Sequence, residues 1–179
     1  MNKVFIACLI ALYLCTGLFS GGAWAQRGKQ PSEFGQNTAQ LKYMEDLCAK
    51  ARKGDADAQY KLACCYDMGK GVRKDETAAA LLYLEAAKQG HAEAQYSIGH
   101  CYSMGIGVPK NKKEAGKWIK QAAEQGSGGA QLRLAFDYDF GQDGFPVDEK
   151  EAVKWYKKAA DQGYKSAKVR LRELGVKTR

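Results

Sequence analysis

The residues of this sequence best suited to chemistry are thiols and imidazoles. His100 and Cys101 are adjacent, and Cys64 and Cys65 stand 36 positions before them. Thiolates and imidazoles gathered in one place can bind zinc or provide a nucleophile and a base. The spacing matches no known zinc motif, however, and adjacent cysteines on a helix point about 100° apart. We therefore expect no metal site.

Other motifs for catalysis or cofactor binding are also missing. His91 and His100 are the only near-neutral bases, and no serine or cysteine recurs near them in a pattern that suggests a catalytic triad. The glycine-rich segments MGKGVRKD and MGIGVPKN lack P-loop spacing, and we interpret them as turns. We expect no catalytic residue, no cofactor and no enzymatic activity.

The first 25 residues have the layout of a secretory signal. Lys3 is followed by an apolar run over residues 4–19, which is too short for a membrane span, and then by Ala23, Trp24 and Ala25. The pattern predicts cleavage after Ala25 and a periplasmic or secreted product. A lipid anchor is disfavoured because no small residue precedes Cys15. Without Lys3 the formal net charge falls from +8 to +7, and no second hydrophobic span follows.

Export changes how the cysteines are interpreted, because thiols tend to pair in an oxidising compartment. We expect either buried thiols or a disulfide that joins Cys101 to Cys64 or Cys65. Equivalent positions on stacked helices can lie about 9–10 Å apart, which is beyond the usual limit for a disulfide. We expect Cys48 to be a free or intermolecular thiol.

Lysines form the clearest candidate for a binding surface. Two trios have helical spacing, so each lies on one helix face, and we expect stacking to bring the two faces side by side. Such a surface fits an acidic protein or an anionic glycan. The alternative is an ordinary solvated surface, since lysine is commonly exposed. These residues are Lys113, Lys117, Lys120, Lys150, Lys154, Lys157 and Lys158.

The elements that carry these residues are internal repeats. The segment ARKGDADAQYKLACCYDMGKGVRKD, which begins at Ala51, realigns at Ala87 and again at Ala123. The next step is 37 residues, and its extra residue falls between Gly141 and Pro146. Four columns recur in register: Gly54, Gly90, Gly126 and Gly163; Ala58, Ala94, Ala130 and Ala167; Leu62, Ile98, Leu134 and Leu171; and Tyr66, Tyr102 and Tyr138.

Each repeat predicts a helical hairpin. Apolar residues such as Ala115, Trp118, Ile119 and Ala122 follow helical spacing, and glycine ends the run. Asn111 and Asp148 have the sequence context of helix caps, and Asp75 can cap alone. The aromatic columns, including Trp155, are interpreted as core. We expect helix pairs at 40–53 with 56–68, 75–89 with 92–104, 112–125 with 128–140, and 148–162 with 165–174.

The corresponding domain organisation is a signal peptide at 1–25, a flexible arm at 26–39, a solenoid at 40–174 and a basic tail at 175–179. The fold class is all-α. One hairpin cannot bury its own apolar stripe, but about four stacked hairpins share an elongated core.

The recurring pattern AAxQGxxxAQxxLGxxYxxGxGVxxD, most complete between Ala86 and Asn111, resembles the Sel-one-like repeat, a branch of the tetratricopeptide-like solenoids. The resemblance covers about residues 40–174. It implies a right-handed α–α superhelix whose concave face docks partners, in adaptor or scaffold roles. Some cysteine-rich relatives are associated with β-lactam binding and place a cysteine pair within each unit. Here the cysteines occupy other columns, so neither property is carried over.

Together these features predict an exported protein-interaction module. We expect its partner to be a protein, acidic or part of the cell envelope, and expect no nucleic acid and no membrane span. An alternative is a periplasmic immunity or inhibitor protein that neutralises a toxin. An alternative of another class is a cysteine-dependent hydrolase or redox protein that uses Cys64, Cys65 and Cys101.

Overall fold

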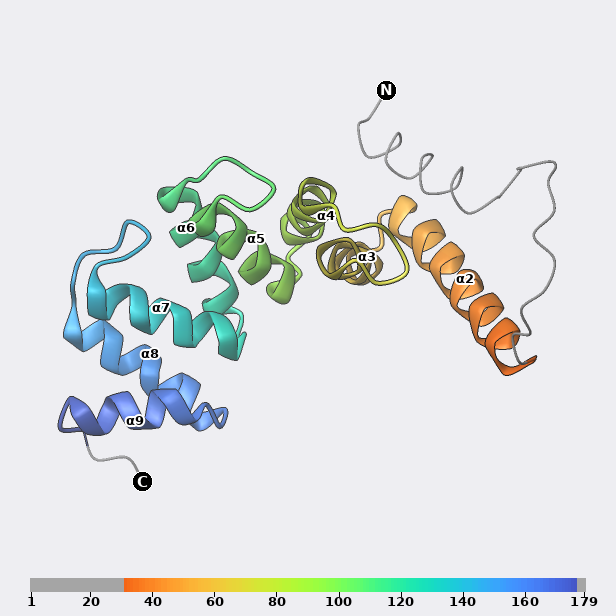
Figure 1. Cartoon of the computed structure of the whole chain (residues 1–179). Helices are drawn as coiled ribbons and strands as arrows, with labels where there is room; N and C mark the ends of the chain where they lie inside the picture. Colours follow the sequence, from red (N-terminus) through yellow and green to blue (C-terminus); the bar gives the residue numbers. More distant parts are fainter. Residues whose placement is uncertain (1–30, 177–179) are drawn as a thin grey trace.

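The computed structural model of the chain describes residues 31–176, with side chains from residue 38 onward (Figure 1). The described part is all-helical and contains no strand. The predicted signal segment, with cleavage after Ala25, and the last residues of the basic tail lie outside the described residues. The helices are α2 (Pro31–Arg52), α3 (Ala56–Met68), α4 (Glu76–Lys88), α5 (Ala92–Met104), α6 (Lys112–Glu124), α7 (Gly128–Phe140), α8 (Glu149–Asp161) and α9 (Lys165–Glu173).

These helices form the four hairpins that the repeats predict, with boundaries within about one residue of those expected, except at the start of α2. That helix begins at Pro31, within the segment 26–39 that the sequence assigns to an arm. Proline is favoured in the first turn of a helix. From residue 38 onward, the buried residues of α2 are Met44, Leu47 and Ala51, and these are the residues that give the helix its apolar pattern.

The predicted caps are confirmed. The side chain of Asn111 accepts a hydrogen bond from the backbone N–H of Glu114, and Asp148 accepts one from Glu151, both at 3.1 Å. Asp75 caps α4 in the same way. The turn interpretation of the glycine-rich segments is also confirmed, because Gly69 and Gly105 end α3 and α5 in the left-handed conformation.

The helices pack mainly against their neighbours in the sequence, which produces the elongated array of Figure 1, with α2 at one end and α9 at the other. The repeat columns form its interior: the alanine column is almost completely buried, and Leu62, Ile98, Leu134 and Leu171 are inaccessible to solvent. Small alanines let the helices approach closely, and the larger column fills the space between them. This arrangement is an α-solenoid.

A ladder of buried glutamines crosses the repeat boundaries. Gln95 on α5 donates from Nε2 to the carbonyl oxygen of Ala87 at the end of α4, and its Oε1 accepts from Gln125 at the end of α6. Gln59 and Gln131 make the same two kinds of bond in their own repeats. Each glutamine thus satisfies a helix-end carbonyl and ties its repeat to the next one.

The loop after the second helix of each hairpin folds back onto the first helix. A Cβ atom at Gly107 would overlap the carbonyl oxygen of Glu76, and one at Gly116 would overlap the carbonyl oxygen of Asp143. Glycine is therefore required at both close approaches. The second contact places the loop with the extra residue, 141–148, directly on α6.

Among the described residues, no helix combines the length and the apolar character that a membrane crossing requires.

Candidate functional site

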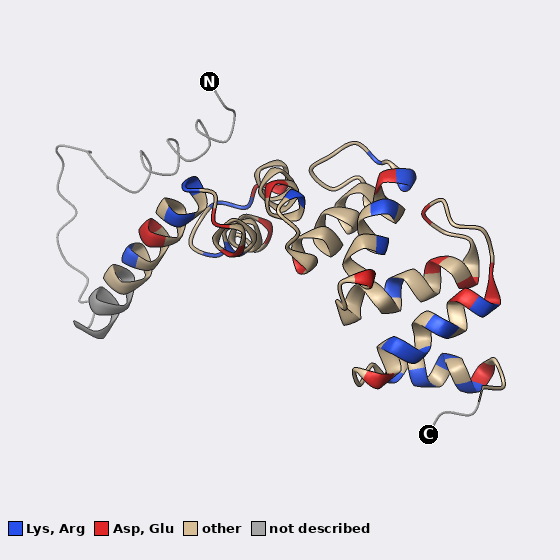
Figure 2. Cartoon of the chain, turned by 180° about the vertical axis from the view of Figure 1, so that it is seen from behind, with Lys and Arg blue, Asp and Glu red and all other residues tan. Residues whose placement is uncertain are grey.

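The seven lysines predicted as a binding surface lie on α6 and α8, and all are exposed. Both helices pack against α7. Figure 2 shows lysine and arginine recurring along α6, α8 and α9. That the two lysine faces form one continuous surface stays a prediction.

A tryptophan lies beneath several of these lysines. Lys117 lies 5.8 Å from the centre of the Trp118 ring, and Lys154 and Lys158 lie 5.6 and 4.1 Å from that of Trp155. Trp155 is buried and Trp118 half-buried, as expected for core residues. The rings attract the ammonium groups through cation–π interactions while leaving the charges exposed.

Ion pairs use only part of this charge. Lys117 lies 3.9 Å from Glu114 and Lys154 lies 3.0 Å from Glu151, one turn away on the same helix. The other five lysines of the set have no carboxylate partner within the described part of the chain. Exposed pairs of this kind contribute little to stability.

The disulfide between Cys101 and Cys64 or Cys65 stays a prediction. Cys64, Cys65 and Cys101 carry free thiols in the structure. Helix α4 packs between α3, which carries Cys64 and Cys65, and α5, which carries Cys101. The hydroxyl of Tyr83 on α4 donates to Cys64 Sγ at 3.5 Å, and burial raises the pKa of the Cys101 thiol to about 11. Cys48 is half-buried on α2.

The two histidines lie at different places on the second hairpin. His91 caps α5 by accepting a hydrogen bond from the backbone N–H of Ala94, and its ring stacks on Tyr60 at 4.7 Å. His100 is exposed on α5. Within residues 38–176, no three side chains of histidine, cysteine, aspartate or glutamate are arranged to hold a metal ion.

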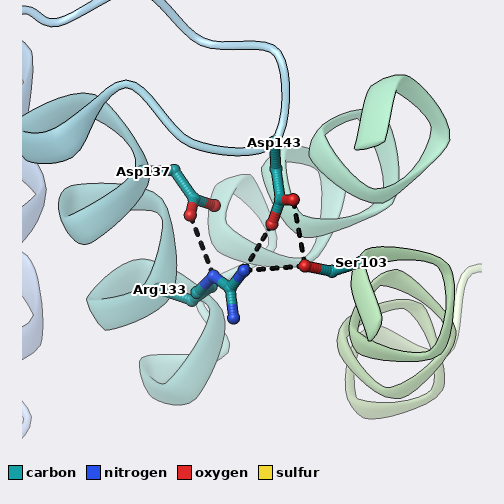
Figure 3. Close-up of polar contacts among 4 residues, drawn as sticks. All are labelled: Ser103, Arg133, Asp137 and Asp143. Atoms are coloured by element: carbon teal, nitrogen blue, oxygen red, sulfur yellow. Dashed lines mark hydrogen bonds and ion pairs between the residues drawn. The ribbon is translucent and has the colours of Figure 1, made fainter. Parts of the chain in front are cut away.

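A buried polar cluster that the sequence did not predict joins the second and third hairpins (Figure 3). Arg133 on α7 donates from Nε to Asp137 at 2.9 Å, and from Nη2 to both Asp143 and the hydroxyl of Ser103 on α5. That hydroxyl in turn donates to Asp143 at 2.9 Å. The two aspartates are at most 3% exposed.

The electrostatics of this cluster are unbalanced, because one guanidinium faces two buried carboxylates. One oxygen of Asp137, Oδ2, is buried and has no hydrogen-bond partner in the described structure. Burial raises the pKa of Asp137 to about 6, against the opposing effect of Arg133, and the charge of Asp143 raises it further.

Asp143 reaches this position because of the extra residue in the loop between α7 and α8. Its backbone is left-handed, with φ at +46°, a conformation that aspartate tolerates better than most residues. The 37-residue repeat step was the signal in the sequence, although that step alone does not show where the carboxylate points.

Beside this cluster lies an open cavity of about 410 Å³. Its walls combine aromatic rings with the two arginines that occupy equivalent repeat positions. The lining residues are Tyr96, Gly129, Leu132, Arg133, Phe136, Tyr156, Ser166 and Arg170.

Arg170 is held as firmly as Arg133. It donates from Nε and Nη2 to the two oxygens of Asp139, at 2.7 and 3.1 Å, and from Nη1 to Glu173. Asp139 also accepts from the hydroxyl of Tyr156, and the hydrogen bond from Arg170 lowers the pKa of Asp139. The cavity therefore combines aromatic rings with guanidinium groups that are held by carboxylates.

A second cavity, of about 520 Å³, opens between α4 and α6 next to the lysine surface. Trp118 and Lys88 line it together with the amides of Gln121 and Gln125. The Nε1–H of Trp118 is buried and has no hydrogen-bond acceptor in the described structure.

Stacked helical hairpins in register define a helical-repeat protein of the α-solenoid class. The Sel1 repeat model matches residues 56–91, 92–127 and 129–164. The chain therefore belongs to the Sel1 repeat family, whose members are generally protein-interaction modules without enzymatic activity. A comparison with curated protein sequences finds no match.

Solved structures agree with this assignment. A Sel1 repeat protein from Oxalobacter formigenes is 35% identical with a TM-score of 0.67, over 73% of this chain and 97% of that one. The protective antigen c5321 of uropathogenic Escherichia coli, which displays an SLR fold, is 35% identical with a TM-score of 0.69 over 74% of this chain. This chain spans only 29% of that antigen's length.

A third structure, Helicobacter pylori cysteine rich protein B, shares the fold at 21% identity and a TM-score of 0.55, over 68% of this chain and 92% of that one.

Proposed function

We propose that this chain is an exported protein-interaction module that docks a macromolecular partner on the concave face of its solenoid. The lysines of α6 and α8 provide the contacts that attract the partner. The observation that carries the proposal is that both helices present exposed lysines beside a tryptophan in the same repeat register, and that five of the seven have no carboxylate partner in the described structure.

The charge pattern favours an acidic protein as the partner. Unpaired ammonium groups on a rigid scaffold steer an acidic surface toward it and lose little entropy on docking. The cavity beside Trp118 adds the side of the tryptophan as an apolar wall at the edge of the same surface. An acidic protein with a protruding apolar side chain would complement both features.

Immobilised protein tests this proposal when it is incubated with an extract of the cell envelope. The triple variant Lys120→Gln, Lys157→Gln, Lys158→Gln should lose a partner that the wild type retains. The matched control Lys42→Gln, Lys53→Gln, Lys70→Gln removes the same charge from exposed positions elsewhere and should retain it. Equal retention by both triple variants would overturn the role of the lysines.

Export is tested separately on the full chain with a carboxyl-terminal tag. Residues 1–25 support a product that appears in the periplasm or the medium with Gln26 as its first residue. An uncleaved chain that stays in the cytoplasm would contradict export. If the captured partner is a toxin whose action the protein blocks, the function is that of an immunity protein.

A further inference from the structure

The open cavity between α7 and α9 exists because the third repeat lacks two side chains that the second repeat has. Gly129 stands where the second repeat has Glu93, and Leu132 stands where it has Tyr96. Both smaller residues line the cavity. A Cβ atom at Gly129 would lie 3.4 Å from the ring of Tyr96, which is ordinary contact, so nothing in the backbone geometry requires glycine there.

The chain itself shows what the tyrosine at the end of the cavity can bind. One repeat earlier, the equivalent Tyr60 carries the ring of His91 stacked at 4.7 Å. The residue equivalent to His91 in the third repeat is Ser127, and no ring within residues 38–176 stacks on Tyr96. Phe136, on the cavity wall, is 45% exposed. Two aromatic surfaces therefore face an open space.

The arginines of the cavity decide between charged and neutral ligands. Arg133 is bound to Asp137 and Asp143, and Arg170 to Asp139 and Glu173, so four carboxylates surround two guanidinium groups. An additional carboxylate or phosphate would be repelled. The hydrogen bonds of Arg133 within the described structure come from Nε and Nη2, and Figure 3 draws the remaining nitrogen without a bond to the other three residues. Nη1 can therefore donate to a neutral carbonyl oxygen.

We propose that this cavity binds an aromatic side chain of a partner polypeptide. The ring packs between Tyr96, Leu132 and Phe136, and Arg133 Nη1 donates to a backbone carbonyl of the same partner. Aromatic residues are common anchors in protein interfaces because they bury a large area with few rotatable bonds. The inference rests on the proposed function, since it assigns one contact of a protein partner.

The test is an NMR titration of the isotope-labelled protein with N-acetyl-tryptophanamide, which carries a ring and neutral carbonyls. We expect saturable shifts at Gly129, Leu132 and Arg133, with a Kd on the order of 1 mM, as befits a small ligand. N-acetylalaninamide and N-acetylaspartamide should bind at least tenfold more weakly. Shifts that do not saturate, or equal binding of the aspartate compound, would overturn the proposal.

Two variants locate the binding. Gly129→Leu fills the cavity and should weaken binding at least tenfold, and Phe136→Ala removes an exposed wall and should weaken it several-fold without disturbing the core. Met104→Ala removes an exposed apolar side chain outside the cavity and should leave the Kd unchanged. If Gly129→Leu fails to fold, the comparison of Phe136→Ala with Met104→Ala still tests whether the ligand binds in the cavity.

The outcomes separate this inference from the proposed function. If the lysine variant loses its partner while N-acetyl-tryptophanamide fails to bind the wild type, the cavity assignment alone is wrong. If the amide binds as expected while no partner depends on the lysines, the cavity stands and the lysine surface is wrong.

Discussion

Replacing Asp137 with asparagine should change the pH dependence of stability in a direction that follows from its buried position. The pKa of Asp137 is about 6 in the folded protein and about 3.9 in an unfolded chain. The folded state therefore binds more protons between these values, so the free energy of unfolding decreases as the pH rises from about 4 to about 6. A difference of about two pKa units corresponds to a loss of up to about 3 kcal/mol.

Asp137→Asn removes this titration and leaves the ion pair between Arg133 and Asp143 in place. The asparagine amide has no acceptor near Oδ2, which costs about 1 kcal/mol at every pH. The decisive quantity is therefore the difference in unfolding free energy between wild type and variant as a function of pH. That difference should decrease by about 2–3 kcal/mol between pH 4 and pH 7, in urea denaturation followed by circular dichroism.

Asp139→Asn is the matched control. Hydrogen bonding to Arg170 lowers the pKa of Asp139, so its stabilising contribution is complete above the unfolded pKa and is lost only as the pH falls below about 4. The difference between wild type and this variant should be constant from pH 5 to pH 7. A flat difference for Asp137→Asn over pH 4–7 would refute the assignment of Asp137 as a buried, poorly compensated charge.

Three further predictions concern stability and thiol chemistry. Gln95→Leu leaves the Ala87 carbonyl and the Gln125 amide without their partner, so it should lower the unfolding free energy by about 1–3 kcal/mol. The control Glu124→Leu, at an exposed site, should have little effect. Equal losses in the two variants would contradict a stabilising role for the glutamine ladder. Gly129→Ala should raise the unfolding free energy by up to about 1 kcal/mol in thermal denaturation, because alanine favours the helix and its Cβ atom meets only ordinary contacts. A decrease would mean that the space beside Gly129 is not open. Cys101 should resist iodoacetamide at pH 8 in the folded protein, because burial raises the pKa of its thiol, and it should react after unfolding. A disulfide from Cys101 to Cys64 or Cys65 would instead appear as a loss of two hydrogens in the intact mass.

The repeats made most of the fold predictable. Insertions fall in loops and apolar columns fall in helices, so the register alone placed α3 to α9. The start of α2 could not be predicted in this way, because residues 31–41 do not repeat the columns of the later units. Burial of Met44, Leu47 and Ala51 marks the second half.

The candidate site was less predictable, for two physical reasons. The position of Asp143 depends on a left-handed backbone at an inserted residue, which a count of residues does not specify. The placement of the cysteines depends on α4, which packs between the helices that carry Cys64, Cys65 and Cys101, whereas an alignment of columns treats those helices as neighbours. Gly129 was visible as a departure from its column, but only the packing of Tyr96 shows that the departure opens a cavity.

The most direct test of the interaction-module account is site-specific photo-crosslinking in an envelope extract. Benzoylphenylalanine placed at Lys120 or Lys157, on the lysine surface, should capture the same protein from the extract. The same probe at Lys61, an exposed lysine on α3, should not capture it. The account also predicts that the protein is no longer captured when the remaining lysines of α6 and α8 are changed to glutamine. Capture of no protein at Lys120 and Lys157, or equal capture at Lys61, would contradict the account.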